Sequence, residues 1–224
     1  MSERTKVALL DIDGTLIDSN DQHAQAWVDV GREFGIDIDY GHVRRLIGMG
    51  GDKVLPEVAG LEEDSPTGEK IKERRGEIFR ETYLPTLKPF PQARELLQRL
   101  RDDGWMLVVA TSASKDDMDG LLKQAGIKDL IEEKTSSSDA EESKPDPDIV
   151  QAALKTAGAR PEQALMLGDT PYDVTASGRA GVRCVALRCG GWGDADLGEA
   201  VAVYDDPADL LSRYDESPYA AERA

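Results

Sequence analysis

The chain has 224 residues, of which 40% are hydrophobic and 32% are charged, a composition typical of a globular protein with one full core and room for a smaller second unit. Its formal net charge of -17 repels polyanions, so we expect neither nucleic acid nor an anionic membrane as a partner. No apolar run approaches the roughly 18 residues of a membrane helix, and the amino terminus lacks a signal-peptide layout, which predicts a cytoplasmic protein.

The first predicted element is a buried strand over Val7–Leu10, a short apolar run bounded by polar residues. About 70 residues separate it from a predicted helix that opens at Pro91, far more than a usual strand-to-helix loop contains. The apolar positions of this stretch, such as Ala24, Trp27 and Phe34, have helical spacing. We therefore predict two domains, a core formed by residues 1–17 and 89–224 and an inserted α-helical cap formed by residues 18–88.

Downstream of the predicted cap, apolar runs and segments of helical period alternate along the chain. The strands are predicted at Met106–Ala110, Ala164–Leu167 and Cys184–Leu187, with a weaker one near Leu130–Lys134. The helices are predicted at Pro91–Arg101, Lys115–Gln124, Pro147–Thr156 and Tyr172–Ala180. This alternation indicates an α/β fold with a doubly wound parallel sheet. Ser217–Ala224 is predicted to be a loose tail.

Polar residues follow the predicted strands at the sheet edge where open parallel sheets bind their ligands. They are Asp11, Asp13 and Thr15 after the first strand, Thr111 and Ser112 after the second, Asp169 and Asp173 after the third, and Lys144 ahead of a helix. Carboxylates about 4 Å apart repel by roughly 4 kcal/mol per pair at an effective dielectric near 20, so we expect a divalent cation, and Mg²⁺ fits best. Raised carboxyl pKa values are the alternative.

A carboxylate held by Mg²⁺ beside a lysine suits in-line attack on phosphorus, because both cations offset charge on the transferring oxygens. Asp11 is the predicted nucleophile. Asp13 lies two residues further on and therefore on the same side of an extended segment, where it can protonate the leaving oxygen and later deprotonate a water. The predicted substrate is a small phosphorylated metabolite.

Together these segments resemble the four motifs of the haloacid dehalogenase-like superfamily, and the insertion resembles the helical cap of its phosphoglycolate phosphatase and β-phosphoglucomutase branch. The resemblance implies that the metal ligands are Asp11, the main-chain carbonyl of Asp13, and Asp169, and that Asp173 acts on a metal-bound water or holds the lysine. It also implies that Thr111, or Ser112 in its place, binds phosphoryl oxygens together with Lys144.

Three further residues are predicted to lie near the substrate. Relatives often use a histidine at the position of His23 there, although a surface position on a helix is the alternative. Arg45, or its neighbour Arg44, can bind a carboxylate or phosphate as a fork, with a solvated side chain as the alternative. Thr15 is typical of the phosphatases, and its hydroxyl is expected to help hold the acid/base aspartate in place.

Other functions stay open at this stage. A sugar phosphomutase of the same branch usually has valine at the position of Thr15 and arginine at that of Gly51, although the segment from Ser112 to Lys115 looks mutase-like. A dehalogenase has no use for Asp13. A non-catalytic module that binds phosphorylated ligands is the alternative from another class. Phosphoglycolate and a hexose or pentose phosphate are the leading substrates, and the oligomeric state is not predicted.

Overall fold

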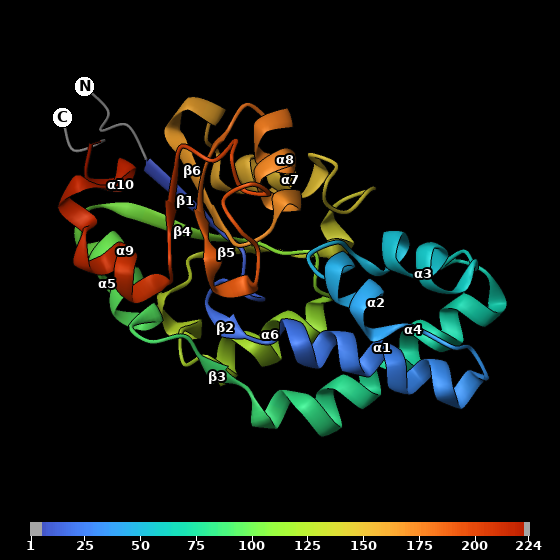
Figure 1. The fold of residues 1–224 in the computed structure, drawn as a ribbon. Helices are drawn as coiled ribbons and strands as arrows, with labels where there is room; N and C mark the ends of the chain where they lie inside the picture. The colour runs from blue at the N-terminus through green and yellow to red at the C-terminus, as the bar shows by residue number, and fades with distance from the viewer. Residues whose placement is uncertain (1–5, 222–224) are drawn as a thin grey trace.

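The protein is described by a computed structural model over residues 6–221, in which a six-stranded parallel sheet has helices on both faces (Figure 1). The strand order is β5-β4-β1-β6-β7-β8. The strands are β1 (Lys6–Leu10), β4 (Trp105–Ala110), β5 (Glu133–Thr135), β6 (Ala164–Gly168), β7 (Arg183–Leu187) and β8 (Ala202–Tyr204). The predicted doubly wound α/β fold is confirmed.

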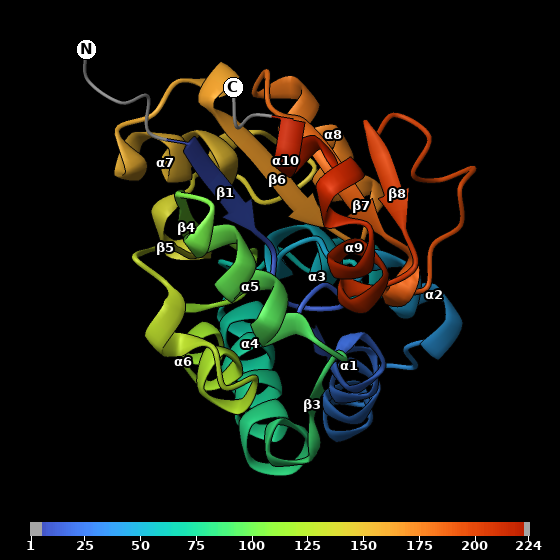
Figure 2. The same cartoon turned by 90° about the vertical axis from the view of Figure 1, so that its left-hand side faces the viewer.

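Alternating side chains of each strand supply the two faces of the sheet. Val7 and Leu9 belong to a core shared with α7 and α8, whereas Ala8 and Leu10 pack with α5, α6 and α9. Figure 2 shows α7 and α8 on one face of the sheet and α5 and α9 on the other. These helices are α5 (Ala93–Asp102), α6 (Lys115–Gln124), α7 (Asp148–Ala157), α8 (Pro171–Arg179) and α9 (Pro207–Ser212). Burial on both sides explains why the strands appear in the sequence as continuous apolar runs.

The long insertion between β1 and β4 is helical. It contains α1 (Asn20–Phe34), α2 (Tyr40–Leu46), α3 (Gly51–Ala59) and α4 (Pro66–Ile78), followed by a π-helical turn over Phe79–Tyr83 and a 3-10 turn over Leu84–Thr86. The chain enters and leaves this segment through an antiparallel pair of short strands, β2 (Ile17–Asp18) and β3 (Lys88–Pro89). The division into core and cap domains at this point stays a prediction.

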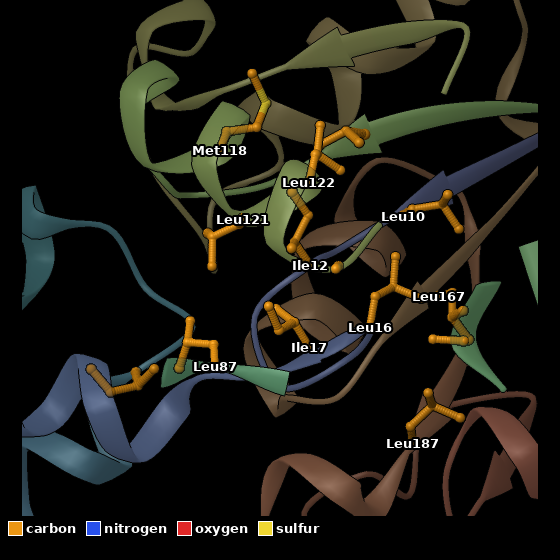
Figure 3. Close-up of a cluster of buried hydrophobic side chains, with 14 of the residues drawn as sticks. Leu10, Ile12, Leu16, Ile17, Leu87, Met118, Leu121, Leu122, Leu167 and Leu187 are labelled. Carbon is orange, nitrogen blue, oxygen red and sulfur yellow. The ribbon is translucent and has the colours of Figure 1, made fainter. Parts of the chain in front are cut away.

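The larger hydrophobic core runs without a break from the sheet into the inserted helices. Figure 3 shows Ile12, Leu16 and Ile17 between the sheet residue Leu167 and Leu87, which precedes β3. Trp27 of α1 is 4% exposed and belongs to the same cluster. Packing therefore holds the inserted helices against the edge of the sheet where the polar residues lie.

The carboxyl-terminal part departs from the prediction. The loose tail is wrong for residues 217–221, because Pro218–Ala221 forms α10 and the Tyr219 side chain is fully buried. The Tyr219 ring packs edge-on against Trp105 at 5.1 Å between centroids, and the Trp105 indole N–H donates to the Tyr219 carbonyl at 3.3 Å. Residues 222–224 lie outside the described part. Strand β8 and helix α9 were also not predicted.

Among residues 6–221, no helix combines the length and the apolar character that crossing a bilayer requires.

Candidate active site

Three buried aspartates meet at the carboxyl edge of the sheet. Asp11 directly follows β1, Asp169 follows the neighbouring strand β6, and Asp173 lies in the first turn of α8. One carboxylate oxygen from each lies within 4.8 Å of the others. The exposed fractions are 6%, 0% and 1%, so water screens this repulsion poorly.

A single buried lysine lies between two of these acids. The ammonium nitrogen of Lys144 is 2.7 Å from Asp11 Oδ1 and 2.7 Å from Asp173 Oδ1. Burial lowers the pKa of Lys144, but the two aspartates more than compensate and hold it above its ordinary value. Asp173 is fixed in turn by Thr170, whose hydroxyl caps α8 and donates to Asp173 Oδ2 at 2.7 Å.

One lysine leaves the three aspartates with excess negative charge. Burial raises the pKa of Asp11 to about 7, although Lys144 acts in the opposite direction. Burial and the neighbouring Asp173 and Asp11 raise the pKa of Asp169 well above its ordinary value. A further cation at this point would relieve both effects.

The surroundings of Asp169 fit a hard divalent cation such as Mg²⁺. Asp169 accepts from the Thr15 hydroxyl at 2.7 Å and from Asn20 Nδ2 at 3.0 Å, while the buried Asn20 Oδ1 has no partner among the described residues. A Cβ added at Gly190 would lie 1.7 Å from Asp169 Oδ2, so only glycine allows this close approach. The available donors are all oxygens, as Mg²⁺ prefers.

Asp173 leaves no room for a side chain at position 168. Gly168 immediately precedes Asp169 at the end of β6. A Cβ at Gly168 would lie 2.5 Å from both the Cβ and Cγ of Asp173. An acidic side chain at 168 is therefore incompatible with Asp173 in its present place.

Asp13 lies outside the three-carboxylate cluster and faces the inserted helices. Its Oδ1 accepts from the Ser19 hydroxyl at 2.5 Å and lies 2.8 Å from His23 Nε2. Burial raises the pKa of Asp13, but His23, Ser19 and Arg75 outweigh this and hold it below its ordinary value. The ring of His23 stacks on Phe79 at 3.9 Å, which fixes its plane.

Arg75 determines the tautomer of His23. Its guanidinium contacts His23 Nδ1 and also donates to Asp117 Oδ2 at 3.2 Å. Because a guanidinium only donates, Nδ1 must be the acceptor, and Nε2 then carries the hydrogen that it donates to Asp13. Sequence analysis missed Arg75 and Asp117. The available signal was a charged residue on the buried face of α4, in helical register with Ile71 and Ile78.

These groups border a cavity of about 750 Å³ between the sheet edge and the inserted helices. Asp11, Asp13, His23, Thr111 and Ser112 line it. Thr111 is buried and its Oγ1 accepts from the Ala113 amide at 3.1 Å, whereas the buried Ser112 Oγ has no partner among the described residues. Both remain candidates for binding phosphoryl oxygens.

Two predicted substrate-binding residues lie elsewhere. Thr15 contacts Asp169 and, at 3.3 Å, Asp11, and is not a cavity residue. Arg45 also lies outside the cavity, with its guanidinium 5.5 Å from the centroid of the Trp192 ring. Its neighbour Arg44 pairs with Asp21 and donates to the Gly190 carbonyl at 2.9 Å.

The sequence family described as "Haloacid dehalogenase-like hydrolase" matches residues 8–187. The chain belongs to this family. The predicted family is thus confirmed, and the matched range includes all the segments predicted to form its four motifs, from Asp11 to Asp173.

Named relatives of this haloacid dehalogenase-like hydrolase include a phosphoglycolate phosphatase from Aquifex aeolicus, which is 32% identical over 222 residues that cover 94% of this chain and 97% of the relative. The chloroplastic protein SUPPRESSOR OF QUENCHING 1 of Arabidopsis thaliana is 33% identical over 83% of this chain, which spans only 18% of that protein. Among solved structures, a hydrolase from Pseudomonas syringae has a TM-score of 0.87 at 30% identity and covers 95% of this chain and 99% of its own.

Proposed function

We propose that this haloacid dehalogenase-like hydrolase is a Mg²⁺-dependent phosphatase that releases phosphate from a small metabolite through an aspartyl phosphate on Asp11. The observation that carries the proposal is the environment of Asp11, which lines the cavity. Its carboxylate is held by the Lys144 ammonium at 2.7 Å and lies beside Asp169, and both of these residues are fully buried next to the cavity lining. The phosphatase name of the Aquifex relative supports the same class, a phosphoric monoester hydrolase.

In the first half-reaction, Asp11 attacks phosphorus, the bond to the leaving oxygen breaks, and Asp13 donates a proton to that oxygen. Without substrate, Asp13 is a carboxylate because its pKa is lowered. The phosphate dianion raises that pKa when it binds nearby, so that Asp13 acquires its proton together with the substrate. Ser19 and the Nε2 hydrogen of His23 hold Asp13 Oδ1 in place meanwhile.

In the second half-reaction, a water attacks phosphorus while Asp13 takes a proton from that water. The bond between phosphorus and the Asp11 oxygen breaks, which regenerates the Asp11 carboxylate and frees inorganic phosphate. Lys144, with Thr111 or Ser112, offsets charge on the phosphoryl oxygens in both steps. Asp173 positions Lys144 through the second ion pair of that lysine.

The residues that would hold Mg²⁺ are Asp11, Asp169 and the main-chain carbonyl of Asp13, with Asn20 and Asp173 beside them. The ion supplies charge neutralisation, so that a dianionic phosphate can approach a carboxylate nucleophile. Thr15 orients Asp169 in this arrangement, which is a role in the metal site and not in substrate contact.

The phosphomutase remains the rival within the fold. Position 51, where the mutases carry arginine, is a glycine that lines the cavity, and a Cβ there would lie 2.6 Å from Glu63 Oε1. A basic side chain at 51 is therefore missing from this cavity. The threonine at position 15, typical of the phosphatases, favours transfer to water as well. Its hydroxyl, however, contacts Asp169 and Asp11 and not Asp13, contrary to the expectation from the sequence.

The proposal is tested by release of phosphate from 4-nitrophenyl phosphate with Mg²⁺ and with EDTA, together with rapid-quench labelling from radioactive phosphate esters. We expect Mg²⁺-dependent release and label on Asp11 that accumulates in Asp13→Asn. Release that persists in EDTA, or the absence of label in both proteins, contradicts the proposal. Conversion of glucose 1-phosphate to glucose 6-phosphate, followed in parallel, would identify the mutase.

A further inference from the structure

The wall and mouth of the cavity are far more acidic than the chain as a whole. Besides Asp11 and Asp13, eight carboxylates and three basic side chains line the cavity, whereas the whole chain has 44 acidic and 27 basic residues. The excess of negative charge at the cavity is therefore a local feature of this site.

All three lysine and arginine side chains that line the cavity form ion pairs with carboxylates of the protein. Lys72 lies 2.9 Å from Glu63. Arg75 and Arg80 share Asp117 at 3.2 and 2.8 Å, and Asp117 is only 3% exposed. Two arginines that share one aspartate leave one positive charge uncompensated. Asp13 compensates that charge, since Arg75 also lowers the pKa of Asp13. No lining residue among those described thus offers a free cation to a ligand carboxylate.

Five of the carboxylates, in contrast, are exposed and have no ion-pair partner among the described residues: Asp64, Glu69, Glu73, Asp116 and Glu141. Glu69 and Glu73 lie one turn apart on α4, Asp116 lies at the start of α6, and Glu141 precedes the loop that carries Lys144. Negative charge therefore faces the cavity from the inserted helices and from the core. A ligand with a positive charge would relieve repulsion on both sides.

The other polar groups of the lining are hydroxyls, including Ser112, Ser114, Ser137 and Ser138. Serine hydroxyls both donate and accept, which suits the hydroxyl groups of a sugar or polyol. A volume of about 750 Å³ is ample for a leaving group of hexose size.

From this arrangement we propose that the substrate is a phosphate monoester of a polyhydroxylated amine, such as an amino sugar, and that esters whose leaving group carries a carboxylate are disfavoured. This inference rests on the proposed phosphatase function. The phosphate binds at Lys144 and Asp11, and the ammonium group of the leaving part lies toward Glu69 and Glu73. Exposed charges act at a distance through water, so the preference depends on ionic strength.

The test uses three esters of similar size that differ in charge: glucosamine 6-phosphate, glucose 6-phosphate and 6-phosphogluconate, at a pH where the amine is protonated. The values of kcat/KM are measured with Mg²⁺, and each ester is also titrated as an inhibitor of 4-nitrophenyl phosphate hydrolysis, so that an ester that is not turned over still yields a binding constant. We expect the amine to exceed the acid by about tenfold at low salt, with the neutral sugar between them. The ratio should shrink toward one near 1 M salt, where the screening length is about 3 Å.

The variant Glu69→Gln with Glu73→Gln should reduce the ratio of amine to acid by about threefold at low salt. The matched control is Glu57→Gln with Glu81→Gln, which removes two exposed charges from the same segment outside the cavity and should leave the ratio unchanged. Neither glutamate has an ion pair in the described part of the chain. Equal constants for the three esters, a preference for 6-phosphogluconate, or equal changes in both double variants overturn the inference. If the wild type does not hydrolyse 4-nitrophenyl phosphate in a Mg²⁺-dependent way, the proposed function itself is overturned. Failure of the substrate inference can therefore be distinguished from failure of the proposed function.

Discussion

Carboxylates gather both at the floor and at the mouth of the cavity, but they differ in burial and in pairing. The floor consists of Asp11, which lines the cavity, together with Asp169 and Asp173, which are buried beside it outside the lining; Lys144, Thr15 and Thr170 fix these carboxylates. At the mouth, residues such as Glu69 and Glu73 are exposed and have no ion pair within residues 6–221. Rigid, desolvated charges act strongly and at fixed positions, which suits catalysis, whereas exposed charges act weakly and at longer range, which suits selection among leaving groups. Changes on the floor should therefore have much larger effects than changes in the wall.

The largest effect is expected on the floor from Asp11→Asn, which keeps the shape of the side chain and removes the nucleophile. We expect kcat for 4-nitrophenyl phosphate to fall by at least about a thousandfold. The control is Asp37→Asn, an exposed aspartate without an ion pair to any residue that the structure describes, which should retain wild-type activity. Residual activity within tenfold of wild type in Asp11→Asn would remove Asp11 from the mechanism.

A second change on the floor, Asp169→Asn, separates catalysis from stability. The pKa of Asp169 is raised by burial, so its ionisation costs folding free energy once the pH exceeds the unfolded value of about 4. Without metal, the wild type should lose stability as the pH rises from about 4 toward 7, and Asp169→Asn should lose less. Mg²⁺ should restore stability to the wild type alone. Urea unfolding at several pH values, with EDTA and with Mg²⁺, measures this, and parallel pH profiles of the two proteins would contradict it.

Arg75 lines the cavity and contacts His23 and Asp117. Arg75→Gln should lower kcat by about tenfold to a hundredfold with little change in KM, because the His23 tautomer that holds Asp13 is no longer enforced. Arg75→Lys should recover part of the loss. Arg74→Gln is the matched control, since Arg74 pairs with Glu33 and Glu77 outside the cavity. If both glutamine variants behave alike, the role of Arg75 is only structural.

The smallest effect is expected where the inserted helices touch the loop of Lys144. The Gly50 amide donates to Ser143 Oγ at 2.9 Å, and that hydroxyl donates to Asp52 Oδ1 at 2.5 Å. Ser143→Ala removes this link next to Lys144 and should raise KM by about threefold with kcat nearly unchanged, because one hydrogen bond between segments is worth about 1 kcal/mol. Ser212→Ala, on an exposed helix end far along the chain, serves as the control. Loss of kcat larger than the rise in KM would place Ser143 in the catalytic step.

Parts of the fold were predictable because they depend on local patterns. The apolar runs that became β1, β4, β6 and β7 follow from burial on both faces of a parallel sheet. Ser217–Ala224 was predicted to be a loose tail because so short a segment shows no hydrophobic periodicity of a helix or strand. Tyr219 is instead ordered by Trp105, which lies 114 residues earlier in the chain.

By itself, the sequence determined most of the strands and helices in chain order and the polar residues at the strand ends, because the residues that follow parallel strands, Asp11 and Asp169 among them, lie at the same edge of the sheet. The adjacency of β1 and β6, which brings these two aspartates together, is a feature of the tertiary structure. Tertiary structure decided the rest. It joined Arg75 of α4 to His23 of α1 and Asp117 of α6, and it placed Arg45 against Trp192. Of the two roles that the resemblance implied for Asp173, the structure shows the contact with Lys144. Such pairs depend on how helices pack across one another, and side-chain spacing along one segment carries no information about which segment it will meet.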